Sequence, residues 1–240
     1  MDGKNTSMET WCNQLRETGG RGGAFSRALM EEERRKQTRL ATLSASIGLP
    51  LYETHTYHLP GDRGRMDRRC AELEKAGWKL SVRLLDTRDG QLLLRDVNVA
   101  AKALAATVRD PHFERCTALV SPYKDPTTSG TVLVSSGDAL LEMVNGPHYW
   151  LTKSPPEGVS ILRCWYRFPS PSVQYSTDDP AERLQLFQSL RDVVRMTVGV
   201  SLRQLSEIRS SLYAEYHWRS DLGYRFLECS YSSVWTGGPL

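Results

Sequence analysis

The chain has 240 residues, of which 40% are apolar and 25% are charged, and its formal net charge at pH 7 is +3. These values are ordinary for a globular protein, and the length suffices for one large domain or two small ones with a buried core. The arginines and lysines are spread along the chain, which disfavours a nucleic-acid-binding stripe.

Targeting and redox signals are absent from the sequence. We read no signal peptide and no apolar run long enough to span a membrane, so the default compartment is the cytoplasm. The five cysteines are odd in number and form no CxxC pair. This argues against a disulfide framework and a zinc finger, and predicts cysteines that pack as small apolar side chains.

The first half of the chain is expected to alternate helices with antiparallel strands. Residues 1–23 form a polar, glycine-rich segment that we expect to be flexible. Asp89-Gly90 is a strong turn signal inside a predicted hairpin. The expected elements are a helix at 24–46, a strand at 51–59, a helix at 67–76, hairpin strands at 79–85 and 91–97, and a helix at 100–108.

The second half is dominated by strands, with helical pieces before a closing hairpin. Asp179-Pro180 has the pattern of an N-cap followed by proline in the first turn of a helix. The mixture of antiparallel strand pairs and helices predicts an α+β fold. The expected elements are strands at 117–121, 130–135, 139–144 (extended at 149–152) and 159–168, a loop at 169–180, helices at 180–198 and 201–213, and a hairpin within 213–229.

The closing hairpin carries two carboxylates, Glu215 on its first strand and Glu228 at the end of its second. Two such residues can lie side by side on one face of a hairpin. Like charges in that position cost stability unless a cation joins them, and a hard divalent ion shared with phosphates suits oxygen ligands. The alternative is an ordinary hairpin with two solvated glutamates.

Four segments, in chain order, resemble the nucleotide-binding domain of the ATP-grasp fold, in the divergent form of phosphoenolpyruvate synthase, pyruvate phosphate dikinase and rifampin phosphotransferase. A weaker fifth likeness is Gly19-Gly20-Arg21-Gly22 to the Gly-Gly-Lys-Gly opening of that group. The four segments are Leu80-Ser81-Val82-Arg83, Thr128-Ser129-Gly130-Thr131-Val132-Leu133, Leu140-Leu141-Glu142-Met143-Val144-Asn145-Gly146, and the hairpin with Glu215 and Glu228.

The resemblance implies ATP and Mg²⁺ as cofactors, with a nucleotide site between two subdomains, 24–116 and 117–232, followed by a tail at 233–240. It gives Arg83 a catalytic contact with ATP phosphates, and Glu215 and Glu228 the metal. The sequence adds Lys79, which shares the strand face of Arg83. Glu142 is a candidate for the ribose or adenine edge. Val120 lies in the apolar strand before Pro122, whose backbone is a candidate for the adenine ring.

The implied activity is that of an ATP-dependent ligase or phosphotransferase whose acceptor the sequence does not identify. A partner protein that supplies the acceptor, and a homo-oligomer, both stay open. The sequence departs from the group after Arg83, where Leu84-Leu85-Asp86-Thr87 replaces a Ser-Ser-Ala-Thr-x-Glu-Asp run. This departure motivates a second hypothesis, a nucleotide-binding or regulatory module without turnover. A third is an interaction protein that binds an acidic partner and no nucleotide.

Overall fold

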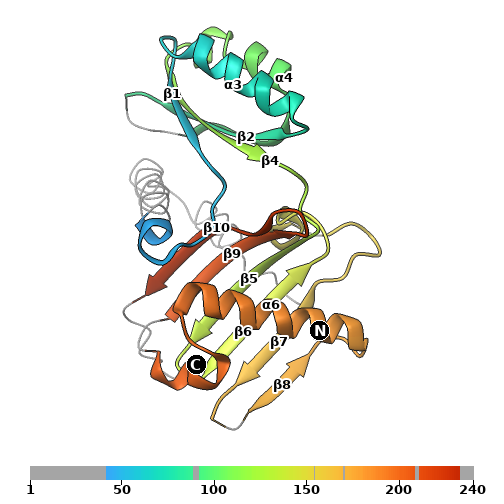
Figure 1. Ribbon diagram of the computed structural model, residues 1–240. Helices are drawn as coiled ribbons and strands as arrows, with labels where there is room; N and C mark the ends of the chain where they lie inside the picture. Colours follow the sequence, from blue (N-terminus) through green and yellow to red (C-terminus); the bar gives the residue numbers. More distant parts are fainter. Residues whose placement is uncertain (1–41, 89–91, 154, 170, 209–210, 233–240) are drawn as a thin grey trace, which may run out of the picture. The chain divides into compact units, whose positions relative to one another are not determined.

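A computed structural model describes residues 42–88, 92–153, 155–169, 171–208 and 211–232. The described chain forms two compact units, one of residues 52–125 and the other of residues 42–51 and 126–232 (Figure 1). Each unit has its own antiparallel sheet and helices, so the expected α+β class is confirmed. No helix in these residues is both long and apolar enough to cross a membrane.

The unit of residues 52–125 has a four-stranded sheet with the strand order β1-β4-β2-β3. All of its strand pairs are antiparallel. Its elements are β1 (His55–His58), α3 (Arg63–Lys75), β2 (Lys79–Asp86), β3 (Leu92–Val99), α4 (Ala101–Thr107), a 3-10 helix (Pro111–Phe113) and β4 (Cys116–Tyr123).

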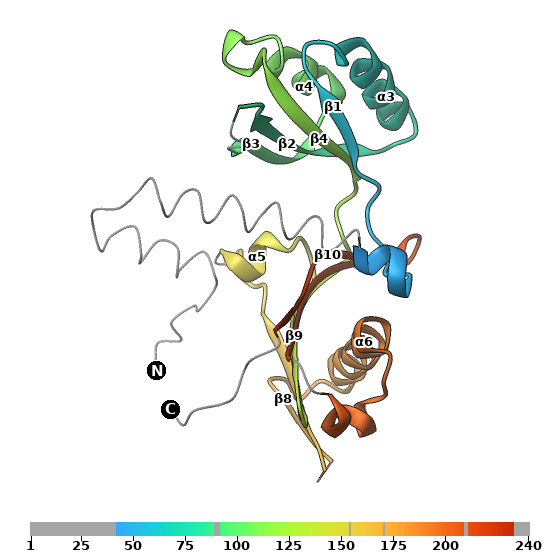
Figure 2. The same ribbon diagram turned by 90° about the vertical axis from the view of Figure 1, so that its left-hand side faces the viewer.

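The alternation of apolar residues along β2 explains how this sheet is covered. Leu80, Val82 and Leu84 are fully buried and pack in one core with residues of α3 and α4. Both helices lie on the same side of the sheet (Figure 2). Because successive strand residues point to opposite faces, Ser81 and Arg83 belong to the face turned away from these helices.

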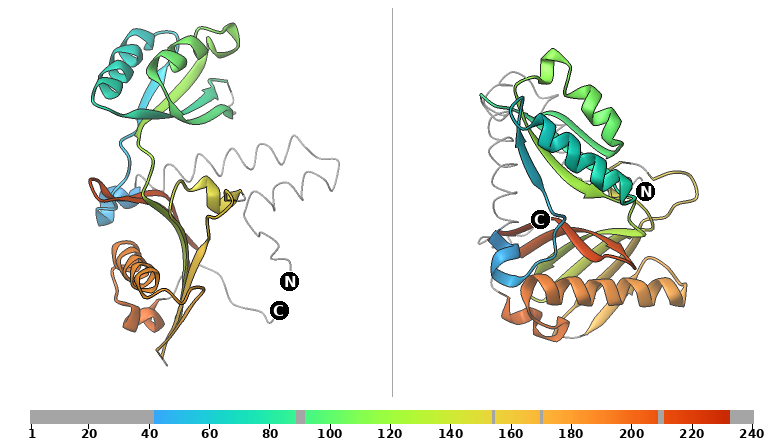
Figure 3. Two further views of the ribbon diagram at one scale, coloured as in Figure 1. Left: turned by 90° about the vertical axis from the view of Figure 1, so that its right-hand side faces the viewer. Right: turned by 45° about the horizontal axis from the view of Figure 1, so that its top comes forward.

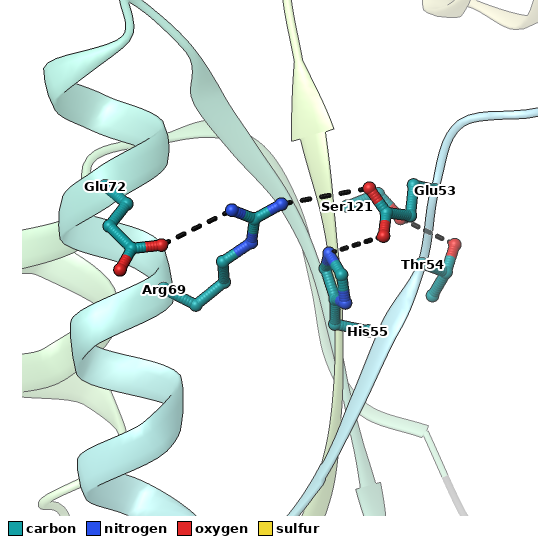
Figure 4. Close-up of polar contacts among 6 residues, drawn as sticks. All are labelled: Glu53, Thr54, His55, Arg69, Glu72 and Ser121. Carbon is teal, nitrogen blue, oxygen red and sulfur yellow. Dashed lines mark hydrogen bonds and ion pairs between the residues drawn. The ribbon is translucent and has the colours of Figure 1, made fainter.

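Polar contacts tie α3 to the segment that enters β1 (Figure 4). Arg69 lies 3.3 Å from Glu72 of the same helix and 3.8 Å from Glu53, which is 3.3 Å from the Nε2 atom of His55. The hydroxyls of Thr54 and Ser121 are 2.8 Å apart and link this segment to β4. Exposed ion pairs of this kind contribute little stability, so the apolar core carries the unit.

The other unit has a six-stranded sheet with the strand order β10-β9-β5-β6-β7-β8. All of its strand pairs are antiparallel. Its elements are β5 (Thr128–Ser135), β6 (Asp138–Val144), α5 (Tyr149–Thr152), β7 (Leu162–Arg167), β8 (Ser172–Tyr175), α6 (Pro180–Val198), a 3-10 helix (Leu202–Glu207), β9 (Ser211–Arg219) and β10 (Gly223–Ser232).

Helix α6 covers one face of this sheet (Figure 3). The Asp179 side chain caps it by accepting hydrogen bonds from the amides of Ala181 and Glu182, as the sequence predicts, and Gly199 ends it with a φ of 74°. The buried side of α6, with Leu186, Leu190 and their neighbours, joins the core of the sheet. Helix α5 lies on the opposite side of the sheet from α6 (Figure 2).

Three expectations for local structure are wrong. Tyr149–Thr152 is a helical turn and does not extend β6. The expected helix at 201–213 is a short 3-10 helix, and its last residues belong to β9, where Leu212 is buried on the core face of a strand. The expected loop at 169–180 contains β8, which forms the edge of the sheet. Of the expected helix at 24–46, only residues 42–46 are described, and they are helical.

The boundary between the two units differs from the one expected at 116/117. The units divide between Asp125 and Pro126, because β4 pairs with β1 and β2 and so belongs to the first unit. The expected flexible segment at 1–23, its likeness to the Gly-Gly-Lys-Gly motif, and the tail at 233–240 lie outside the described residues.

Candidate functional site

The two glutamates of the closing hairpin are cross-strand neighbours. Glu228 on β10 is the Cα partner of Glu215 on β9. A bulge between Phe226 and Glu228 sets this register, because without the extra residue Glu215 would lie opposite Leu227. Cross-strand partners share a face of the sheet, so the two carboxylates lie side by side, as the hairpin pattern predicts.

A polar row continues from this pair across the sheet. Each member is the Cα partner of the next on the adjacent strand. The core residues of β9, Leu212, Ala214 and Tyr216, alternate with Glu215, so the row lies on the face away from α6. In order from β10 to β7, the row is Glu228, Glu215, Thr131, Glu142 and Arg163.

Glu215 is held by neighbours on two sides. The hydroxyl of Tyr213 donates a hydrogen bond to the carboxylate, and Nε2 of His148 lies 3.7 Å from Oε2. The same His148 nitrogen is 3.4 Å from the hydroxyl of Thr131. The side chains of Glu215 and His148 are only 17% and 12% exposed, so these polar groups interact in a partly desolvated place.

Burial shapes the acid–base state of two other side chains here. It raises the pKa of Tyr213, and the adjacent Glu215 carboxylate raises it further, so the phenol stays a hydrogen-bond donor. Burial lowers the pKa of His217 to about 3, with a smaller contribution from His148, whose ring centroid is 6.4 Å away. His217 is therefore neutral at pH 7, and we assign it no role as a general acid.

Glu142 has a strong local partner. The Nε atom of Arg163 donates to its Oε1 over 2.7 Å, and the Glu142 side chain is 37% exposed. This ion pair accounts for a carboxylate between the buried Leu141 and Met143. Glu142 therefore shares the row of the hairpin pair, and its expected contact with ribose or adenine stays a prediction.

Arg83 and Lys79 lie on β2, in the unit of residues 52–125. The Cα partners of Arg83 are Leu119 on β4 and Arg95 on β3. The register therefore places two arginines opposite one another on neighbouring strands, and the guanidinium of each is a donor suited to phosphate. Arg95 was not predictable from a short motif, because only the strand register shows that it faces Arg83.

Val120 is a core residue. Its side chain is 1% exposed, and β4 has a paired strand on each side, with His55 of β1 and Val82 of β2 as partners. Its backbone therefore lies within the sheet. We leave Val120 out of the site proposed below.

Among the described residues, no group of three or more His, Cys, Asp or Glu side chains is arranged to hold a metal ion. Glu215 and Glu228 are a pair of carboxylates with the hydroxyl of Thr131 next in the row. All three are oxygen donors. Mg²⁺ is commonly held by one or two carboxylates together with phosphates and water, so the donor set fits a nucleotide-bound magnesium ion.

No protein-family model matches the sequence, and no curated protein matches it. Three solved structures with some similarity are the macrocyclase MdnC from Microcystis aeruginosa MRC bound with precursor peptide MdnA, N5-carboxyaminoimidazole synthase from Aspergillus clavatus with ADP and 5-aminoimidazole ribonucleotide, and the ATP-grasp ligase PsnB with minimal precursor, Mg and ADP. Identities are 11%, 10% and 12%, and TM-scores are 0.43, 0.45 and 0.42.

The matches cover 85%, 81% and 84% of this chain but 54%, 43% and 51% of those chains, so the chain spans about half the length of the solved structures it matches. Similarity at this level does not assign the chain to a family. The resemblance of its motifs to the phosphoenolpyruvate synthase group stays a prediction, and the proposal below rests on the geometry of the hairpin.

Proposed function

We infer that this chain is an ATP-grasp-like domain that binds ATP with Mg²⁺ and supports a ligase or phosphotransferase reaction. The observation that carries the proposal is the register of β9 and β10, which makes Glu215 and Glu228 direct neighbours on one face of the sheet. Two adjacent carboxylates offer oxygen ligands of the kind that a divalent cation such as Mg²⁺ takes in proteins.

In this proposal, Glu215 and Glu228 would hold the ion together with phosphates of ATP. The ion, when bound, neutralises charge on the transferring phosphoryl group. The chain's own contribution is to keep the two carboxylates in place, which the paired strands do through their backbone hydrogen bonds. The site identifies neither the acceptor nor a partner protein that supplies it.

Arg83 and Lys79 enter the proposal as contacts for the ATP phosphates. A guanidinium fixed on a strand suits bidentate contact with phosphate, and its partner Arg95 adds positive charge on the same face. Glu142 enters as a ribose or adenine contact. Its carboxylate already accepts a hydrogen bond from Arg163.

The direct test is isothermal titration calorimetry with Mg²⁺ and a non-hydrolysable ATP analogue. We expect the wild-type chain to bind, and Glu228→Gln to weaken binding at least about 10-fold because it removes one of two charged ligands. Glu157→Gln is the matched control, since Glu157 is an exposed turn residue that is not a member of the row. No heat with the wild type, or equal binding by Glu228→Gln, contradicts the proposal.

A nucleotide-binding module without turnover is the second candidate. The observation that favours it is that Glu215 already has internal partners, Tyr213 and His148. The two candidates differ in phosphate release. Binding of ATP with no release of phosphate or ADP, in the presence of each acceptor tried, supports the module, and measurable release supports the enzyme.

A further inference from the structure

The loop before α5 is anchored over the polar row. The hydroxyl of Ser129 on β5 donates to the carbonyl oxygen of Gly146 over 2.6 Å. A Cβ atom at Gly146 would lie 2.1 Å from the ring of Trp150, so only glycine permits this ring to pack against the loop. The φ of 145° at Gly146 also favours glycine. Two independent contacts therefore fix the path of the chain into His148.

His148, two residues after Gly146, occupies the N-cap position of α5, and its side chain makes no capping hydrogen bond. Its Nε2 atom reaches the Oε2 of Glu215 (3.7 Å) and the hydroxyl of Thr131 (3.4 Å). Because Thr131 is itself the Cα partner of Glu215, the imidazole lies above two adjacent members of the row. With only 12% of its side chain exposed, His148 has little freedom to leave this place.

The two oxygens of Glu215 have different neighbours. Tyr213 donates to Oε1, while His148 approaches Oε2. A carboxylate offers about four lone-pair sites, so two such neighbours leave capacity for a cation. A carboxylate that accepts a hydrogen bond at one oxygen and lies against an imidazole at the other is restrained in its rotation, and such restraint is what supporting partners give a metal ligand.

We propose that His148 is a positioning residue that holds Glu215 in the orientation in which it binds the divalent ion. This rests on the proposed function, and it assigns His148 no contact with the ion or the nucleotide. We take the tautomer in which Nε2 carries the proton, so that an N–H approaches Oε2 of Glu215 at 3.7 Å. A side chain that places a donor there should therefore support binding, and one of similar size without a donor should not.

The test measures the affinity for Mn²⁺, in the presence of a non-hydrolysable ATP analogue, by calorimetry or electron paramagnetic resonance. We expect His148→Leu to weaken Mn²⁺ binding about 10-fold, the typical effect of losing a ligand's supporting partner. His148→Gln keeps a donor and should bind close to wild type. His148→Ala is a second variant without a donor, and the exposed His112, replaced by Leu, is the control.

Each variant is also melted, so that a loss of fold is not mistaken for a loss of positioning. Weak binding by the Leu and Ala variants at an unchanged melting temperature, with recovery in the Gln variant, supports the inference. If the wild type binds Mn²⁺ and the Leu variant binds equally well, the inference is overturned and the proposed function stands. If the wild type binds no Mn²⁺, both are overturned.

Discussion

At the scale of single residues, the structure separates packing roles from candidate chemical roles within the same motif. Gly130 belongs to a segment that resembles a nucleotide-binding motif, yet its position is explained by its neighbour Tyr216. The two are Cα partners, and the Tyr216 ring lies directly over the glycine. Thr131, one residue later, points to the opposite face and joins the polar row.

We predict that Gly130→Ala destabilises the chain by about 1–3 kcal/mol, the usual cost of overpacking a core. A Cβ at this position would lie 2.4 Å from the Tyr216 ring, which is fully buried. The measurement is urea unfolding followed by fluorescence.

The control is Gly61→Ala, where the nearest atom to an added Cβ is at an ordinary 3.7 Å. It should change the unfolding free energy by less than about 0.5 kcal/mol. Equal effects of the two substitutions would show that the Tyr216 ring can move aside.

At the scale of elements, helices and hairpins with strong end signals were predictable, and features set by tertiary contacts were not. The N-cap at Asp179 marks the start of a helix as predicted, and the strands predicted on either side of Asp89-Gly90 pair as β2 and β3, although those two residues lie outside the described part of the chain. The segment 201–213 has apolar residues at helical spacing, but Leu212 is drawn into β9 by pairing with β5 and β10. Strand pairing overrode the local pattern there.

The candidate site was only partly predictable, because part of it is set by tertiary contacts. The sequence indicated two glutamates on neighbouring strands, but not the bulge that makes them direct partners. It also gave no sign of His148, which reaches Glu215 from a loop 67 residues earlier in the chain. Contacts of that separation depend on how the loop packs, which no short pattern records. The role of either glutamate in binding a metal stays a prediction.

A prediction at this scale concerns the start of α6. Asp179→Ala should cost about 1 kcal/mol of stability, because the amides of Ala181 and Glu182 lose their acceptor. Thermal or urea unfolding measures it, since α6 packs on the core of the six-stranded sheet. Asp179→Ser keeps a capping oxygen and should stay within about 0.5 kcal/mol of wild type. An equal loss in both variants would show that the charge, not the cap, matters.

At the scale of the whole molecule, the described chain contains two separate hydrophobic cores, one in each unit. Within the described residues, one unit is the single stretch 52–125, while the other combines residues 42–51 and 126–232. The candidate metal ligands belong to the six-stranded sheet, and Arg83 with Lys79 to the four-stranded one. Substitutions of the candidate metal ligands therefore affect one unit, and substitutions of Arg83 and Lys79 affect the other.

We predict that residues 52–125 fold as an isolated fragment. They contain all four strands of their sheet, both covering helices and a core with Met66, Leu80 and Leu84 completely buried. A domain of this size is marginally stable, so a cooperative melt of low stability is expected, with dispersed amide signals by nuclear magnetic resonance. A fragment that shows neither would mean that this core depends on the rest of the chain.

The central claim is that Glu215 and Glu228 together hold a divalent ion bound to a nucleotide. The most direct measurement is a crystal structure with Mn²⁺ and a non-hydrolysable ATP analogue, using the anomalous signal of manganese. We predict one peak within about 2 to 2.3 Å of a carboxylate oxygen from each glutamate, in contact with the phosphates of the analogue. A bound analogue whose metal lies away from both carboxylates would contradict it, as would crystals that bind neither.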